Sequence, residues 1–461
     1  MADKIHQVER SPWITRTIWV LCLALAVLVN VMALRHHGEE GKYSKRTPVH
    51  LWHMWTGDYE KDLQRYVDSF NKSQNEIEII PLSVPESVTQ SKFLLATASG
   101  DPPDMMWHWM PTVPKWADDG VIQPIDAIMT PDEWKKYKRS MFPIAEKMAM
   151  YKGRLYAVIP YCDVRGLFYR VDDLQEAGLD PNHLPQTLEE LDKWATKLNR
   201  FDKKGNLTRI GFMPTAGLTV SWAMFAPSFG GGFYDWKSNK VTVDTPGNLK
   251  ALEYLVNERK ELGLQNATRF ETGATQAASG ANWPFATGAY SIVVDGMWRV
   301  RFIEKYMPDL KYVTGPIPPP AGGKKNGGWV VGSTIVIPRG AKHPKEAWQF
   351  LKFITGFENP EAPSEMVKDG ILPLFPDVIK SRTFQKYVDS HPQFKTFADV
   401  LPSENLEPTP PVPYQNYLTD RMGEITDRAK LGIITPRQAV DALQKLVYEQ
   451  EAKYKEFHPS E

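Results

Sequence analysis

Downstream of residue 47, short apolar runs alternate with segments whose apolar residues recur at helical spacing. The runs 50–55, 77–80 and 105–109 predict strands, and the segments that end at Phe70 and Ala98 predict helices between them. Strand, helix, strand, helix, strand within residues 50–109 is typical of a parallel sheet with crossover helices. We therefore expect an α/β fold.

The same alternation continues along most of the chain. Further strands are predicted at 155–159, 167–169, 210–212, 290–294, 312–313 and 334–337, and helices at 188–198, 249–262 and 344–354. After Phe357 the pattern becomes mostly helical, is interrupted by the proline-rich stretch 402–413, and closes with an amphipathic helix over 436–454.

One segment near the N-terminus is apolar enough to enter a membrane. Residues 18–34 carry no charge and follow Lys4, Arg10 and Arg16. As a helix this segment covers about 25 Å, which is short for a bilayer span of ~30 Å and long for the apolar part of a signal peptide. A cleaved signal and a retained anchor both imply export, with 38–47 as a polar linker. Apart from Cys22 inside the apolar run, only Cys162 is present, so the exported part forms no internal disulfide.

Composition and charge narrow the class of protein. The 461 residues suggest two or three domains, and 55 Lys and Arg balance 55 Asp and Glu. A net charge of zero argues against a nucleic-acid partner, because such partners are held by clustered cations. The 15 tryptophans exceed an average composition and need an explanation.

Catalytic signatures are missing. The sequence has no P-loop, no G-x-S-x-G elbow, no H-E-x-x-H and no paired C-x-x-C. His50 and His53 would lie on opposite faces of a strand, so a shared metal is not expected. We therefore assign no catalytic residue, cofactor or metal. A glycosidase remains an alternative, because the spacing of its two carboxylates is a spatial property.

Several tryptophans stand at strand ends or beside Gly, Asp and Pro. They are Trp55, Trp107, Trp109, Trp222, Trp283, Trp298 and Trp329. Loops at the carboxyl ends of parallel strands are where α/β proteins place ligands, and a flat ring beside polar groups suits a sugar. Core packing is an equally compatible role for any one of them. Trp194 and Trp348, inside amphipathic helices, are predicted to be core residues.

Seven segments in order resemble the extracellular solute-binding proteins of the sugar-binding type (family 1), the ligand-capturing components of ABC importers. The similarity to maltose- and oligosaccharide-binding proteins runs from about Val49 to Tyr454. It rests on the Trp-Thr-Gly-Asp of 55–58 and on 98–104, 151–160, 167–191, 288–298, 327–329 and 344–354.

The resemblance implies a two-lobed, periplasmic-binding-protein-like fold of type II with ligand in the interlobe cleft. It places the export segment and linker at 1–47, a first α/β lobe at 48–162 and 316–356, and a second at 166–311 and 357–461. Hinge segments are expected to cross near 160–168, 312–318 and 357. Closure would occur by hinge bending.

The resemblance also points to ligand-binding residues. Trp55 and Asp58 would lie at the cleft edge of the first lobe, Trp107 and Trp109 after the next strand, and Asp163 on the hinge. Trp222 matches an aromatic stacking position of the second lobe, Trp298 matches the Trp of that lobe's Gly-x-Trp turn, and Trp329 matches the residue after the Gly-Gly pair. Arg165 and Asp295 complete the candidate set, although Arg165 could instead pair with a surface acid and Asp295 could cap a turn.

The function implied is capture of a carbohydrate, an oligosaccharide given the number of candidate rings, and its delivery to the transmembrane subunits of an ABC permease. The protein would act outside the cytoplasmic membrane, with 18–34 either removed or kept as a tether. Alternatives are a polysaccharide-active hydrolase and a sensory ectodomain. Asp58, Asp163 and Asp295 keep a polyamine ligand open.

Overall fold

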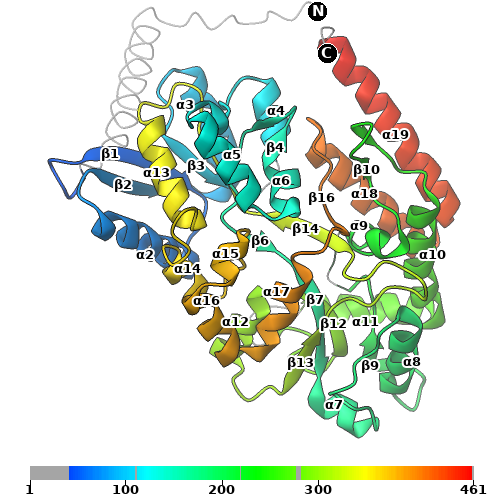
Figure 1. Cartoon of the computed structure of the whole chain (residues 1–461). Helices are drawn as coiled ribbons and strands as arrows, with labels where there is room; N and C mark the ends of the chain where they lie inside the picture. The colour runs from blue at the N-terminus through cyan, green and yellow to red at the C-terminus, as the bar shows by residue number, and fades with distance from the viewer. Residues whose placement is uncertain (1–40, 109–111, 217, 219, 277–281, 459–461) are drawn as a thin grey trace, which may run out of the picture.

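The computed structural model describes residues 41–108, 112–216, 218, 220–276 and 282–458, which form two α/β lobes joined by a narrow strand region (Figure 1). The predicted apolar segment 18–34 and Trp109 lie outside these residues. Within the described ranges every helix is too short or too polar to cross a bilayer.

The first lobe is built on a four-stranded sheet in the order β15-β3-β1-β2. Strands β1 (Thr47–His53), β2 (Ile77–Ser83) and β3 (Met105–His108) are parallel, and β15 (Thr334–Val336) runs antiparallel to β3. Helices α2 (Asp58–Ser73) and α3 (Glu86–Ala98) connect the parallel strands. The parallel sheet with crossover helices predicted from the sequence is confirmed.

Helix α2 follows from the local sequence. Leu63, Val67 and Phe70 form its buried face, while Asp58 and Glu60 stand in its first turn, where carboxylates suit the positive end of the helix dipole. The ring of Phe70 meets those of two phenylalanines of α13 (Pro344–Thr355) edge to face. This packing fixes the face of α2 that is left for the cleft.

The second lobe is built on a five-stranded sheet in the order β13-β7-β12-β9-β8. Its strands are β7 (Arg165–Arg170), β8 (Arg200–Phe201), β9 (Leu207–Phe212), β12 (Tyr290–Gly296) and β13 (Tyr312–Gly315). The main helices of this lobe are α8 (Leu188–Leu198), α10 (Pro246–Glu261), α12 (Trp298–Tyr306), α18 (Gln415–Lys430) and α19 (Pro436–Phe457). Helix α19 begins with a capping box between Thr435 and Gln438.

Further helices and strands complete the two lobes. They are α4 (Val113–Asp118), α5 (Pro131–Ser140), α6 (Pro143–Ala149), β4 (Met150–Tyr151), β5 (Arg154–Leu155), α7 (Val171–Glu176), α9 (Ser221–Phe225), β10 (Tyr234–Asp235), β11 (Lys240–Val241), α11 (Leu264–Gln276), α14 (Ser364–Lys368), α15 (Pro376–Ile379), α16 (Arg382–Ser390) and α17 (Lys395–Val400).

A small sheet in the order β16-β14-β6 lies between the lobes. Strand β14 (Gly328–Gly332) pairs antiparallel with β6 (Cys162–Asp163) and parallel with β16 (Leu406–Pro408). Along the chain, β6 continues into β7 and β14 continues into β15. The chain therefore passes between the lobes at the junctions β6-β7 and β14-β15.

The second passage lies later in the chain than the predicted 312–318. Strand β13 pairs with β7 inside the second sheet, and the prolines that follow stay on that lobe. The Leu188 N–H donates to the Pro319 carbonyl, and the Lys324 N–H donates to the Ser228 carbonyl. Residues 316–327 thus pack on the second lobe, because these backbone hydrogen bonds hold them beside α8 and the 3-10 helix Ala226–Phe229 that follows α9.

The return to the second lobe also comes later than the predicted 357. Helix α14 packs on α2, the Leu372 carbonyl accepts from the Cys162 N–H, and the Leu374 carbonyl accepts from the Phe142 N–H. Contact with the second sheet begins near Gln393, whose carbonyl accepts a 2.7 Å hydrogen bond from the Thr314 hydroxyl. Residues 364–379 therefore remain with the first lobe, where they reach the cleft.

Candidate ligand-binding site

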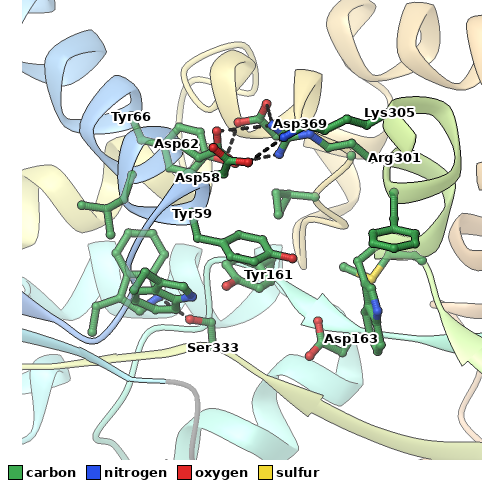
Figure 2. Close-up of a pocket in the computed structure, with 18 of the residues that line it drawn as sticks. Asp58, Tyr59, Asp62, Tyr66, Tyr161, Asp163, Arg301, Lys305, Ser333 and Asp369 are labelled. Atoms are coloured by element: carbon green, nitrogen blue, oxygen red, sulfur yellow. Dashed lines mark hydrogen bonds and ion pairs between the residues drawn. The ribbon is translucent and has the colours of Figure 1, made fainter. Parts of the chain in front are cut away.

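A cavity of about 550 Å³ lies between the lobes. Its walls come from α2 and the ends of β1 and β3 in the first lobe, from α12 in the second, and from the strands between them. Lining residues include Trp55, Asp58, Tyr59, Asp62, Tyr66, Trp107, Tyr161, Asp163, Trp298, Arg301, Phe302, Lys305, Tyr306, Ser333 and Asp369. Figure 2 shows the charged side chains of α2, α12 and Asp369 on one side and Asp163 and Ser333 on the other.

Two tryptophans of the first lobe form an aromatic wall. Trp55, just after β1, meets Trp107 of β3 edge to face, with ring centroids 5.2 Å apart. The indole N–H of Trp107 donates to the Ser333 hydroxyl, which fixes that ring. Trp55 also stacks on His53, whose pKa burial lowers to about 4, so that imidazole is neutral at pH 7. The wall is therefore aromatic and uncharged at pH 7, with its two indole planes nearly perpendicular.

Asp163 supplies a carboxylate at the hinge. Burial raises its pKa to about 6, and only the charge of Arg165 opposes this shift. At pH 7 the group is mostly ionised and accepts hydrogen bonds. A ligand hydroxyl donating to it would form a charge-assisted hydrogen bond, which is stronger than a neutral one.

A cluster of ion pairs lies on the α2 side of the cavity. The Arg301 guanidinium contacts Asp62 at 2.7 Å and Asp369 at 3.3 Å, and Lys305 contacts Asp58 at 2.6 Å. Within the first lobe, Arg65 pairs with both Asp62 and Asp369. Because Arg301 and Lys305 belong to α12, the cluster joins the two lobes.

Arg165 lies behind the cavity wall and supports it. Its guanidinium carbon is 5.4 Å from the ring centroid of Trp298 and 5.2 Å from that of Trp329. Trp298 lines the cavity, whereas Trp329, on β14, donates a 3.3 Å hydrogen bond to the Thr409 hydroxyl. Arg165 thus sits between one cavity ring and one hinge ring, and burial lowers its pKa.

Two other predicted residues lie away from the cavity walls. Asp295 pairs with Arg299 at 2.7 Å and accepts from the Gly296 N–H. Trp222 is fully buried in the second lobe, where its indole N–H donates to the Asn248 carbonyl at 2.7 Å. The reason is that α9 carries Trp222 into the packing between α10, α18 and β14.

The structure brings together Trp55, Asp58, Trp107, Asp163 and Trp298 of the predicted set. Sequence reasoning missed Asp62 and Tyr66, although they follow Asp58 at four-residue steps along α2 and so share its face. Arg301 and Lys305 have the same spacing on α12. No local signal could have found Asp369, which a distant segment carries to the cleft.

These features match a known family. The chain belongs to the bacterial extracellular solute-binding proteins, whose family model matches residues 56–359, more than half of its length. Among solved structures it is similar to CpMnBP1 with mannotriose bound, at 28% identity and a TM-score of 0.72 over 87% of this chain and 100% of that one.

Two curated relatives are also similar in sequence. The maltotriose-binding protein of Pyrococcus abyssi (strain GE5 / Orsay) is 22% identical over 72% of this chain and 67% of its own length. The arabinooligosaccharide-binding protein of Bacillus subtilis (strain 168) is 26% identical over 45% of this chain. The chain spans 46% of that second relative's length.

Proposed function

We propose that this protein is the substrate-binding component of an ABC importer and captures an oligosaccharide in the interlobe cavity. The observation that carries the proposal is the cavity itself, in which aromatic rings of both lobes and the hinge carboxylate of Asp163 face one space. Aromatic faces suit the C–H faces of sugars, and carboxylates suit their hydroxyls. The names of the relatives, which bind mannotriose, maltotriose or arabinooligosaccharides, agree with this ligand class.

Closure around the ligand gives the mechanism. A sugar that contacts Trp55 of the first lobe and Trp298 of the second stabilises the closed arrangement by its differential affinity for that state. The permease then recognises the closed protein. We place the first lobe at 48–162 and 334–379 and the second at 165–327 and 392–458, with the strands between them as the hinge.

The protein is proposed to work outside the cytoplasmic membrane and to bind its sugar without cleaving it. Residues 18–34 would direct export and either be removed or remain as a tether. N-terminal sequencing of the membrane and soluble fractions distinguishes these two outcomes.

Calorimetric titration tests the ligand class. We expect at least one of mannotriose, maltotriose and arabinotriose to bind with micromolar or tighter affinity and to change tryptophan fluorescence. Analysis of the recovered sugar should show it intact after overnight incubation. If no oligosaccharide binds better than millimolar and the fluorescence never changes, the sugar assignment is wrong, and release of shorter sugars would identify a hydrolase.

A further inference from the structure

The ion pairs between α2, Asp369 and α12 lie where the two lobes meet over the cavity. Arg301 approaches Asp62 with both terminal nitrogens, at 2.7 and 3.3 Å, and reaches Asp369 at 3.3 Å. One turn later on α12, Lys305 reaches Asp58 at 2.6 Å. Figure 2 shows the five acidic and basic side chains of this cluster beside the cavity and linked to one another.

Two carboxylates of the cluster, Asp62 and Asp369, need a cation from the second lobe. The side chains of Asp62 and Asp369 are only 8% exposed, and both contact Arg65 of their own lobe. The Tyr66 hydroxyl donates to Asp369 at 2.6 Å. Without Arg301, two poorly solvated carboxylates would share one guanidinium, which leaves uncompensated negative charge.

We propose that Arg301 and Lys305 act as an interlobe charge clamp, which holds the lobes together across the cavity and presets the affinity for the ligand. The clamp is formed by Asp58, Asp62 and Asp369 of the first lobe and by Arg301 and Lys305 of the second. Every partner is supplied by the protein, so the clamp acts in the absence of sugar. Arg301 and Lys305 act as positioning residues. The clamp itself does not depend on the proposed function; only its effect on sugar binding rests on that function.

The clamp makes the binding of a neutral sugar depend on salt. Apparent affinity scales with the fraction of molecules whose lobes are closed. The cluster is partly exposed, since Arg301 is 37% and Lys305 50% exposed. Salt therefore weakens it: the Debye length falls from ~10 Å at 0.1 M to ~3 Å at 1 M. Without the clamp, the affinity for an uncharged ligand would depend very little on salt.

The distance between the lobes tests the clamp without any ligand. Spin labels are attached at Lys92→Cys on α3 and Lys193→Cys on α8, which are both exposed positions. Pulsed electron paramagnetic resonance then measures the distance between the two labels. The experiment uses the full chain with Cys22→Ala. Cys162 is buried and not available to the label. We expect Arg301→Gln, Lys305→Gln and 1 M salt each to at least double the population at longer distances.

Two further variants control for folding and for charge number. Arg437→Gln removes an arginine whose partners, Asp244 and Asp441, lie on its own lobe, and should leave the distances unchanged. The exchange Asp58→Lys with Lys305→Asp rebuilds one pair in reverse and should restore the distances that Lys305→Asp alone lengthens. Identical distance distributions in wild type, Arg301→Gln and the exchange series at both salt concentrations would overturn the clamp.

Sugar titration separates this inference from the proposed function. We expect about fivefold weaker binding in Arg301→Gln, about twofold in Lys305→Gln, and a similar loss on going to 1 M salt. If the distances respond and no sugar binds, the clamp stands and the proposed ligand class fails. If a sugar binds tightly and the distances do not respond, the ligand class stands and the clamp fails.

Discussion

Trp55 and Trp107 meet edge to face, with ring centroids 5.2 Å apart and ring planes at 77°. Trp107 is 1% exposed and its indole N–H donates to Ser333, so it is a fixed ring against which Trp55 packs at the cavity wall. Both rings line the cavity, and Trp55, which is only partly buried, offers a ligand more accessible surface than Trp107.

Trp55→Ala should weaken sugar binding at least tenfold and change stability little. The ring is only partly buried, so its removal costs less packing than removal of a core ring, while the ligand loses a stacking surface. Titration calorimetry measures the loss. Trp194→Ala is the matched control, because Trp194 is also partly buried but packs on Tyr169 away from the cavity. Equal affinities for the two variants would remove Trp55 from the site.

Trp222→Ala should show the opposite behaviour. This ring is fully buried, so the truncation should lower the free energy of unfolding by about 3–5 kcal/mol. The folded fraction should keep its affinity for sugar. Denaturant titration followed by calorimetry at low temperature separates the two effects. A loss of affinity without a loss of stability would return Trp222 to the ligand site.

Asp163→Asn should alter the pH dependence of stability. Because burial raises the folded pKa from 3.8 to about 6, the folded state holds this proton more tightly than the unfolded state. The ionised carboxyl therefore destabilises the fold increasingly as pH rises from about 4 to 6, and by a constant amount above that range. In Asp163→Asn this pH-dependent destabilisation is absent.

The measurement is the free energy of unfolding of both proteins between pH 4 and 7.5. The difference, variant minus wild type, should rise by about 1–3 kcal/mol between pH 4 and 6 and then level off. A difference that is flat with pH would show that Asp163 titrates near its ordinary value. Sugar affinity of the wild type should also fall below pH 6, as the acceptor becomes protonated.

Ser333→Ala should destabilise the first lobe through Trp107. The indole N–H of Trp107 is buried and would lose its acceptor, which costs about 1–3 kcal/mol. Trp107→Phe removes the donor, so the double variant should be less destabilised than the sum of the single variants. A double-mutant cycle by denaturant unfolding gives this coupling, and strict additivity would mean that the two side chains do not interact.

Much of the fold could be predicted because its signals are local. Apolar runs such as that of β1 and the amphipathic face of α2 report secondary structure directly, and their order gave the parallel sheet of the first lobe. The hinge was harder. Both the strand at Tyr312 and the proline run after it suit either lobe, and only their hydrogen bonds to β7, α8 and Ser228 place them on the second.

The sequence by itself determined the elements, the family pattern and the rings and acids from which a sugar site could be made. Tertiary structure decided which of them share a cavity. Trp55 and Trp222 carry the same side chain, yet one lines the cavity and the other is buried, because burial depends on the elements that pack around each. Asp369 joins Asp62 and Arg301 only because distant segments fold back to one place, and no local pattern records such a meeting.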